Sequence, residues 1–183
     1  IGSSLVGSEM CIRDRFIQSL NLVKIELGYE AFHVVILGNE QGRDLYKKKL
    51  MQLTEQYHLT NQIKFIDHCK DMALAYKISD IVISPSIEPE AFGRVAVEAQ
   101  SMEKIIIASN IGGSNETIID GKTGLLFEAG DPNSLSKRII QAVTLDESSY
   151  KRMGKEGRKN IAKKFNVEKM CFSTYSEYKR LLN

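Results

Sequence analysis

The sequence predicts an α/β fold, in which a parallel sheet is flanked by helices and followed by a helical C-terminal tail. Between residues 16 and 127, stretches with apolar residues at helical spacing alternate with short runs that are apolar throughout. Such runs indicate strands buried on both faces, which is typical of parallel sheets covered by helices. After Asp131-Pro132 no further run of this kind occurs, so the remainder is predicted to be helical.

The elements are predicted in a regular order. The first helix has apolar residues at 16, 20, 23 and 27, and the first strand, 32–37, ends at Gly38. Later strands are expected at 63–66, 80–84, 104–109 and 124–127, and the helices between them at 44–57, 72–78, 93–102 and 114–119. The tail is expected to form helices at 134–145, 149–165 and 167–182. No repeat or linker interrupts the pattern, so residues 16–183 are interpreted as one domain.

The opening segment, IGSSLVGSEMCIRDR, is expected to be extraneous. It lacks an initiator Met and resembles the translated adapter-like leaders of fragmentary environmental sequences. We therefore assign residues 1–15 to a leader, part of which can be helical, and expect a protein truncated before Phe16.

Composition excludes several classes of function. The chain of 183 residues carries 25 Lys+Arg against 23 Asp+Glu, a net charge of +2, which gives no reason to expect a nucleic-acid partner. Its three cysteines, Cys11, Cys69 and Cys171, lack a C-x-x-C pair, so neither a disulfide framework nor a zinc site is indicated. With no apolar run of about 18 residues and no signal-peptide core, a cytoplasmic location is expected.

Candidate ligand sites follow the strands, because ligands of open parallel sheets bind at the carboxyl ends of the strands. Gly112-Gly113 precedes a predicted helix start, where close backbone approach and N–H donors favour a phosphate. An ordinary loop with a Ser or Asn helix cap is the alternative. Gly38 opens a second such loop, which lacks G-x-G-x-x-G spacing, so an ordinary turn is the alternative there and no nicotinamide cofactor is expected.

Two acids define a further candidate site. Glu98 lies in an apolar helical stretch, where a carboxylate needs hydrogen-bond donors, and the paired hydroxyls of a sugar supply them. Glu90 precedes the same helix, so the two acids together are placed to hold two sugars of one molecule. The alternative is that Glu98 faces solvent and that Glu90 is an acid favoured by the helix dipole.

Five motifs in order carry a family resemblance. They resemble the Rossmann-like C-terminal donor domain of retaining glycosyltransferases with the GT-B fold, in the large glycosyltransferase group 1 family marked by E-x7-E, from about Phe16 to the C-terminus. The motifs are Glu90-Ala91-Phe92-Gly93-Arg94 with Glu98-Ala99, Ile107-Ala108-Ser109, Gly112-Gly113 with Glu116, Asp120-Gly121 with Thr123-Gly124-Leu125-Leu126, and Gly130-Asp131-Pro132.

The resemblance implies roles for these residues. Glu90, the catalytic candidate, is expected to contact donor-sugar hydroxyls, and Glu98 to bind the ribose hydroxyls. The backbone of Phe92, Gly93, Arg94 and Val95 is expected to approach the pyrophosphate, and Gly112-Gly113 to lie beside the donor sugar and phosphates. Asp67-His68-Cys69 falls where the family's loop touches the nucleobase through its main chain; His68 is not expected to be a general base.

The implied reaction transfers a sugar from a nucleotide diphosphate sugar to an acceptor hydroxyl with retention, in cell-surface glycan or glycolipid synthesis. No metal or other cofactor is expected. The family's N-terminal acceptor domain is missing here, as are the first strand and the Arg and Lys that follow it, so the chain alone is expected to be inactive. The alternatives are a non-catalytic nucleotide-binding domain or a sugar-nucleotide epimerase of related fold.

The missing strand gives a structural expectation. In the strand order 3-2-1-4-5-6 it is central, between the strands at Val34 and Val82. These neighbours are expected to pair directly, to be bridged by leader residues such as Leu5-Val6, or to leave the sheet split with unpaired edges. The family also places Gly and Pro in the turn that here reads Met102-Glu103-Lys104-Ile105.

The tail raises a question about membranes. One side of the helix at 149–165 is basic, with Lys151, Arg152, Lys155, Arg158, Lys159 and Lys163. This stripe is either a solvated face above a core stripe or a contact with anionic lipid at the inner membrane face. The terminal helix, which in this family crosses back to the other domain, is expected to be partly exposed.

Overall fold

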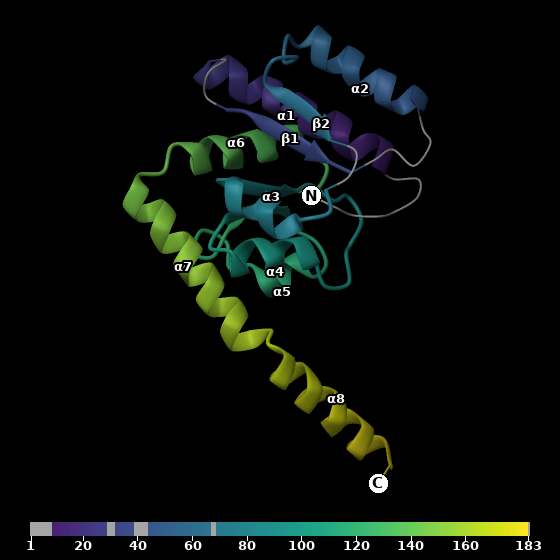
Figure 1. Cartoon of the computed structure of the whole chain (residues 1–183), viewed down its shortest axis with the longest axis vertical. Coiled ribbons are helices and arrows are strands. Elements are labelled where there is room, and N and C mark those ends of the chain that lie inside the picture. Colours follow the sequence, from purple (N-terminus) through teal and green to yellow (C-terminus); the bar gives the residue numbers. More distant parts are fainter. Residues whose placement is uncertain (1–8, 29–31, 39–43, 67–68, 183) are drawn as a thin grey trace.

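The computed structural model describes residues 9–28, 32–38, 44–66 and 69–182, and confirms the predicted α/β order (Figure 1). The elements are α1 (Glu9–Leu27), β1 (Val34–Leu37), α2 (Asp44–Gln56), β2 (Ile63–Ile66), α3 (Met72–Ile78), β3 (Ile81–Ser84), α4 (Arg94–Ser101), β4 (Ile105–Ser109), α5 (Ser114–Thr117), β5 (Leu125–Phe127), α6 (Pro132–Val143), α7 (Glu147–Lys164) and α8 (Val167–Leu182). Most bounds agree with the predicted ones within two residues, and α1 begins earlier, at Glu9.

All strand pairs are parallel, as predicted. Strand β1 pairs with β2, with Val34 opposite Ile63. Strand β4 is central to the second sheet, where Ile107 lies opposite Ile83 of β3 and Leu125 of β5. All five residues of β4 are buried, which is the physical reason for its continuously apolar sequence.

Within the described residues β1 and β3 do not pair, which excludes direct pairing, the first of the three expected outcomes. Leu5-Val6, which were expected to bridge the two strands in the second outcome, lie outside the described residues. The two sheets have the orders β1-β2 and β3-β4-β5, and no strand of the described ranges lies between them. The helix α1 spans residues 16–27 and therefore supplies no strand there. Both edge strands instead border a cavity of about 570 Å³, lined among others by Val34, Val35 and Leu37 and by Ile81, Val82 and Ile83.

Helices pack on both faces and hold the two sheets together. Ile17 of α1 and Ile139 of α6 belong to one core cluster with Ile36 of β1 and Ile107 of β4. A second cluster lies on the other face of the larger sheet, where α3 and α4 pack against Ile106. The start of α4 is thereby fixed close to the end of β3, which positions the candidate site.

Of the tail helices, α6 and α7 pack on the body and α8 extends away from it (Figure 1). Helix α7 buries Met153 and Ile161 and leaves its basic stripe at the surface. Helix α8 has no buried residue, as expected for the terminal helix. Within the described ranges, no helix has the length and apolar character needed to cross a membrane.

Candidate functional site

Two loops at the carboxyl edge of the larger sheet are in backbone contact. The Gly113 N–H donates to the Glu90 carbonyl over 2.8 Å. A Cβ on Gly112 would lie 2.6 Å from the Glu90 carbonyl oxygen, and one on Gly113 would lie 2.6 Å from the Phe92 carbonyl carbon. The two glycines therefore allow an approach that no side chain would permit, and they bring the loop after β3 against the loop after β4.

The start of α4 lies in this contact. Its N-cap, Gly93, has φ +71° and no side chain to bond the first N–H groups of the helix. A Cβ on Gly93 would lie 3.7 Å from the Ser114 nitrogen, so the beginnings of α4 and α5 are adjacent. The first N–H groups of a helix lack partners within it and carry partial positive charge, which favours an anion beside Arg94 and Val95. The Val95 side chain is buried, so only its backbone is presented to such an anion.

Glu98 has hydrogen-bond donors on both carboxylate oxygens. The Tyr76 hydroxyl donates to Oε2 over 2.9 Å, and Arg94 Nη2 donates to Oε1 over 3.0 Å. The Glu98 side chain is 37% exposed, so the carboxylate is stabilised by fixed donors and is still open to solvent. The sequence indicated that this acid needs donors, and the structure adds that the chain itself supplies two of them.

Glu90 differs from Glu98 in that its carboxylate has no partner among the described residues. No described residue forms a hydrogen bond or ion pair with the Glu90 side chain, while its backbone holds the Gly112-Gly113 loop. Phe92, two residues further on, is half exposed and packs edge-on against Phe165, with ring centroids 5.7 Å apart. This contact joins the loop to the junction between α7 and α8.

Two predicted residues are not brought into this contact by the described structure. Gly38 ends β1 in the smaller sheet, where its N–H donates to the Ile66 carbonyl over 3.0 Å. Its φ of +112° requires glycine, which supports the turn interpretation. His68 and Asp67 lie outside the described residues.

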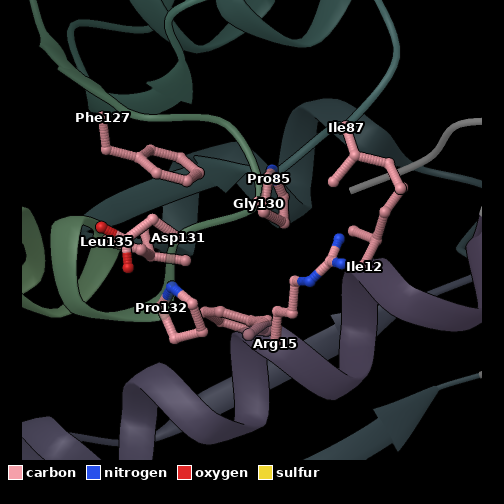
Figure 2. A pocket seen from close by; sticks show the side chains of 10 residues that line it. Ile12, Arg15, Pro85, Ile87, Phe127, Gly130, Asp131, Pro132 and Leu135 are labelled. Carbon is pink, nitrogen blue, oxygen red and sulfur yellow. The ribbon is translucent and has the colours of Figure 1, made fainter.

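Two arginines assigned to the leader lie near the carboxyl edges of the sheets. Arg13 Nη2 donates to the Gly38 carbonyl over 3.3 Å. Arg15 reaches across to the loops after β3 and β5, beside Ile87 and Gly130 (Figure 2). The pocket there has only about 10 Å³, which is room for one water, so it is no ligand site. Both cations lie in the segment 1–15 that the sequence assigns to a leader, so the sequence predicts no role for them.

Comparisons with known proteins agree on one family. The model of the family described as "Glycosyl transferases group 1" matches residues 13–160. The capsular polysaccharide biosynthesis glycosyltransferase CapM of Staphylococcus aureus is 28% identical over 166 residues, which are 91% of this chain and 42% of that protein.

Solved structures show the same fold. A glycosyltransferase from Rickettsia africae superposes with a TM-score of 0.86 at 28% identity, over 99% of this chain and 46% of its own. HepE of Anabaena, crystallised with UDP and glucose, superposes with a TM-score of 0.79 at 22% identity, over 97% of this chain and 47% of its own. The chain therefore spans less than half the length of these proteins.

Proposed function

We propose that this chain, which belongs to the glycosyl transferases group 1 family, binds the nucleotide-sugar donor of a retaining hexosyltransferase. In the proposed complex Glu98 accepts hydrogen bonds from the ribose hydroxyls, and Glu90 from the hydroxyls of the donor sugar. The diphosphate lies between them, against the first N–H groups of α4 and the Gly112-Gly113 loop. We also propose a location on the cytoplasmic side of the membrane, because the proposed reaction uses a nucleotide sugar as its donor substrate.

One observation carries the proposal. The contact between Glu90 and Gly113 joins three features at one edge of the sheet: the Glu90 carboxylate, which no described residue binds, the start of α4, which has no side-chain cap, and the diglycine loop. These groups are suited to a ligand with hydroxyls at both ends and negative charge in the middle. Departure of a nucleoside diphosphate builds up negative charge, which preorganised N–H donors stabilise.

The cell-surface role is a further part of the proposal. Its support is the relative CapM, which is named for capsular polysaccharide biosynthesis. We also propose that the 183-residue chain has negligible transferase activity by itself, because catalysis needs an acceptor held at this edge as well as a donor. Turnover of a nucleotide sugar with an acceptor by the purified chain would contradict this last point.

Calorimetric titration with UDP, GDP and ADP tests the binding function. We expect saturable binding of one nucleotide by the chain and at least about tenfold weaker binding by Glu98→Ala, since a hydrogen bond to a charged group is lost. Glu168→Ala, on the exposed helix α8, is the matched control and should bind as the wild type does. Absence of binding to all three nucleotides would contradict the proposal.

A further inference from the structure

We propose that Tyr76 is a positioning residue for nucleotide binding, because its hydroxyl holds the Glu98 carboxylate in the orientation that receives the ribose. This inference rests on the proposed function, since it takes Glu98 as the ribose-binding acid. It adds a residue from α3, a helix that contributes nothing else to the site.

The position of the Tyr76 hydroxyl is fixed by packing. Tyr76 is 4% exposed and belongs to the core cluster that includes Val95 and Ala99 of α4. Its carbonyl accepts hydrogen bonds from the Ser79 N–H and from Ser79 Oγ, which close the end of α3. Rotation of the ring would disturb a packed core, so the hydroxyl is a preorganised donor to Glu98.

The Tyr76 hydroxyl remains protonated, and so a donor, around neutral pH. Burial raises the pKa of Tyr76, and the hydrogen bond to Glu98 and the charge of that carboxylate raise the pKa further. An ionised phenolate in this place would be both desolvated and repelled by Glu98. Tyr76 thus stays neutral, and its O–H points toward the carboxylate.

The second partner of Glu98 is held much less firmly. The Arg94 side chain is 84% exposed, and its ion pair with Glu98 Oε1 is of the i,i+4 type that contributes little in water. A ribose hydroxyl can therefore displace Arg94 from Oε1, while Tyr76 keeps Oε2 in place. The fixed partner, Tyr76, thus orients the Glu98 carboxylate before the nucleotide binds, and the displaceable partner, Arg94, leaves Oε1 available to the ribose.

The test is deletion of one oxygen atom. Tyr76→Phe keeps the ring, and water can replace the lost donor because the Glu98 side chain is 37% exposed. We therefore expect the variant to fold, which circular dichroism would verify. The probes are UDP, GDP or ADP, whichever the wild-type chain binds most tightly, and its 2′,3′-dideoxy analogue. We expect Tyr76→Phe to weaken binding of the nucleotide about tenfold and to leave binding of the dideoxy analogue unchanged.

Tyr150→Phe is the matched control. Tyr150 is partly buried, and its hydroxyl donates to the Asp80 carbonyl over 2.7 Å, a contact that does not involve Glu98. This variant loses one tyrosine hydrogen bond as well, so it should lower the melting temperature and leave the nucleotide affinity unchanged. In a Glu98→Gln background, Tyr76→Phe should have no further effect on affinity.

The outcomes separate this inference from the proposed function. Suppose that Glu98→Gln weakens nucleotide binding, as the proposed function requires. The positioning role is then overturned if Tyr76→Phe binds the nucleotide with wild-type affinity. It is also overturned if Tyr76→Phe loses equal affinity for the nucleotide and for its dideoxy analogue. If Glu98→Gln binds as the wild type does, or if the wild type binds no nucleotide, the proposed function fails and the positioning role fails with it.

Discussion

Gly112 shows how closely a single residue controls the site. It has φ +54° and a Cβ there would clash with Glu90, whereas Gly121 has φ +72° and open space around it. Both alanine variants would incur the left-handed strain, and only Gly112→Ala would also push the two loops apart. We expect Gly121→Ala to lower the free energy of unfolding by about 1 kcal/mol and Gly112→Ala by about 2–4 kcal/mol.

Chemical denaturation of both variants measures this difference, and calorimetry measures its effect on the nucleotide. Gly112→Ala should also weaken nucleotide binding, and Gly121→Ala should not. Equal stability losses in the two variants would show that the loops are not held together by backbone contact.

The sequence predicts which residues form the candidate site, but it does not predict their hydrogen-bond and packing partners. Glu98 was expected to need donors because a carboxylate in an apolar helix does, but Tyr76 precedes it by 22 positions and carries no local signal. The turn at Glu103 is similar: the residue adopts φ +57° where the family places a turn former, and Gly154 packs directly against its carbonyl. The first contact depends on how α3 packs beside α4 and the second on how α7 packs beside α4, which periodicity alone does not encode.

Helix α7 owes its beginning to a side-chain cap. Asp146 accepts hydrogen bonds from the Ser149 N–H over 3.0 Å and from Ser148 Oγ over 2.6 Å. These bonds favour the carboxylate and lower the pKa of Asp146 well below the ordinary value of 3.8. Because the pKa of Asp146 is lower in the folded state, its carboxylate stabilises the fold at pH values above the pKa of the unfolded state. This stabilisation is lost as the pH falls from the unfolded-state pKa towards the folded-state pKa.

We therefore expect Asp146→Asn to change the acid stability of the chain. Asparagine also caps helices but does not titrate, so the stability advantage of the wild type over this variant should be constant near neutral pH and shrink below about pH 4. Thermal melts of both proteins between pH 3 and 7 provide the measurement. If the stability difference between the wild type and Asp146→Asn does not vary with pH, protonation of Asp146 is not coupled to unfolding.

Element positions were the most predictable level of the structure. Apolar runs located the five strands of the described residues, although only β4 is buried at every position. Val35 of β1 and Lys64 of β2 are exposed, so burial on both faces does not explain the smaller sheet. Helix ends were predicted within two residues where Asp131 or Asp146 provides a cap. Helix α1 begins at Glu9, inside the segment 1–15 that the sequence assigns to a leader and part of which it allows to be helical.

The split sheet is the main feature of the whole molecule. Strand β4 pairs on both sides, whereas among the described residues β1 and β3 each pair on one side and border the cavity on the other. Since successive N–H groups of a strand point to opposite neighbours, alternate amides of β1 and β3 have no strand partner within the described part of the chain. We expect these amides to exchange with solvent deuterium much faster than those of β4.

Amide-resolved hydrogen exchange by NMR tests this expectation. Protection of every β3 amide at the level of β4 would show that another segment fills the cavity. The sequence predicted that the gap exists but left three outcomes open, because the pairing of two edges depends on the placement of α1 and α6 between the sheets.

A crystal structure of the chain with its preferred nucleoside diphosphate tests most directly whether the edge formed by Glu90, Glu98 and Gly112-Gly113 is the nucleotide site. We expect ribose hydroxyls within hydrogen-bond distance of Glu98, with Tyr76 still bound to Oε2, and phosphates against the first N–H groups of α4. A nucleotide seated instead in the cavity between β1 and β3, with Glu98 still paired to Arg94, would contradict this expectation.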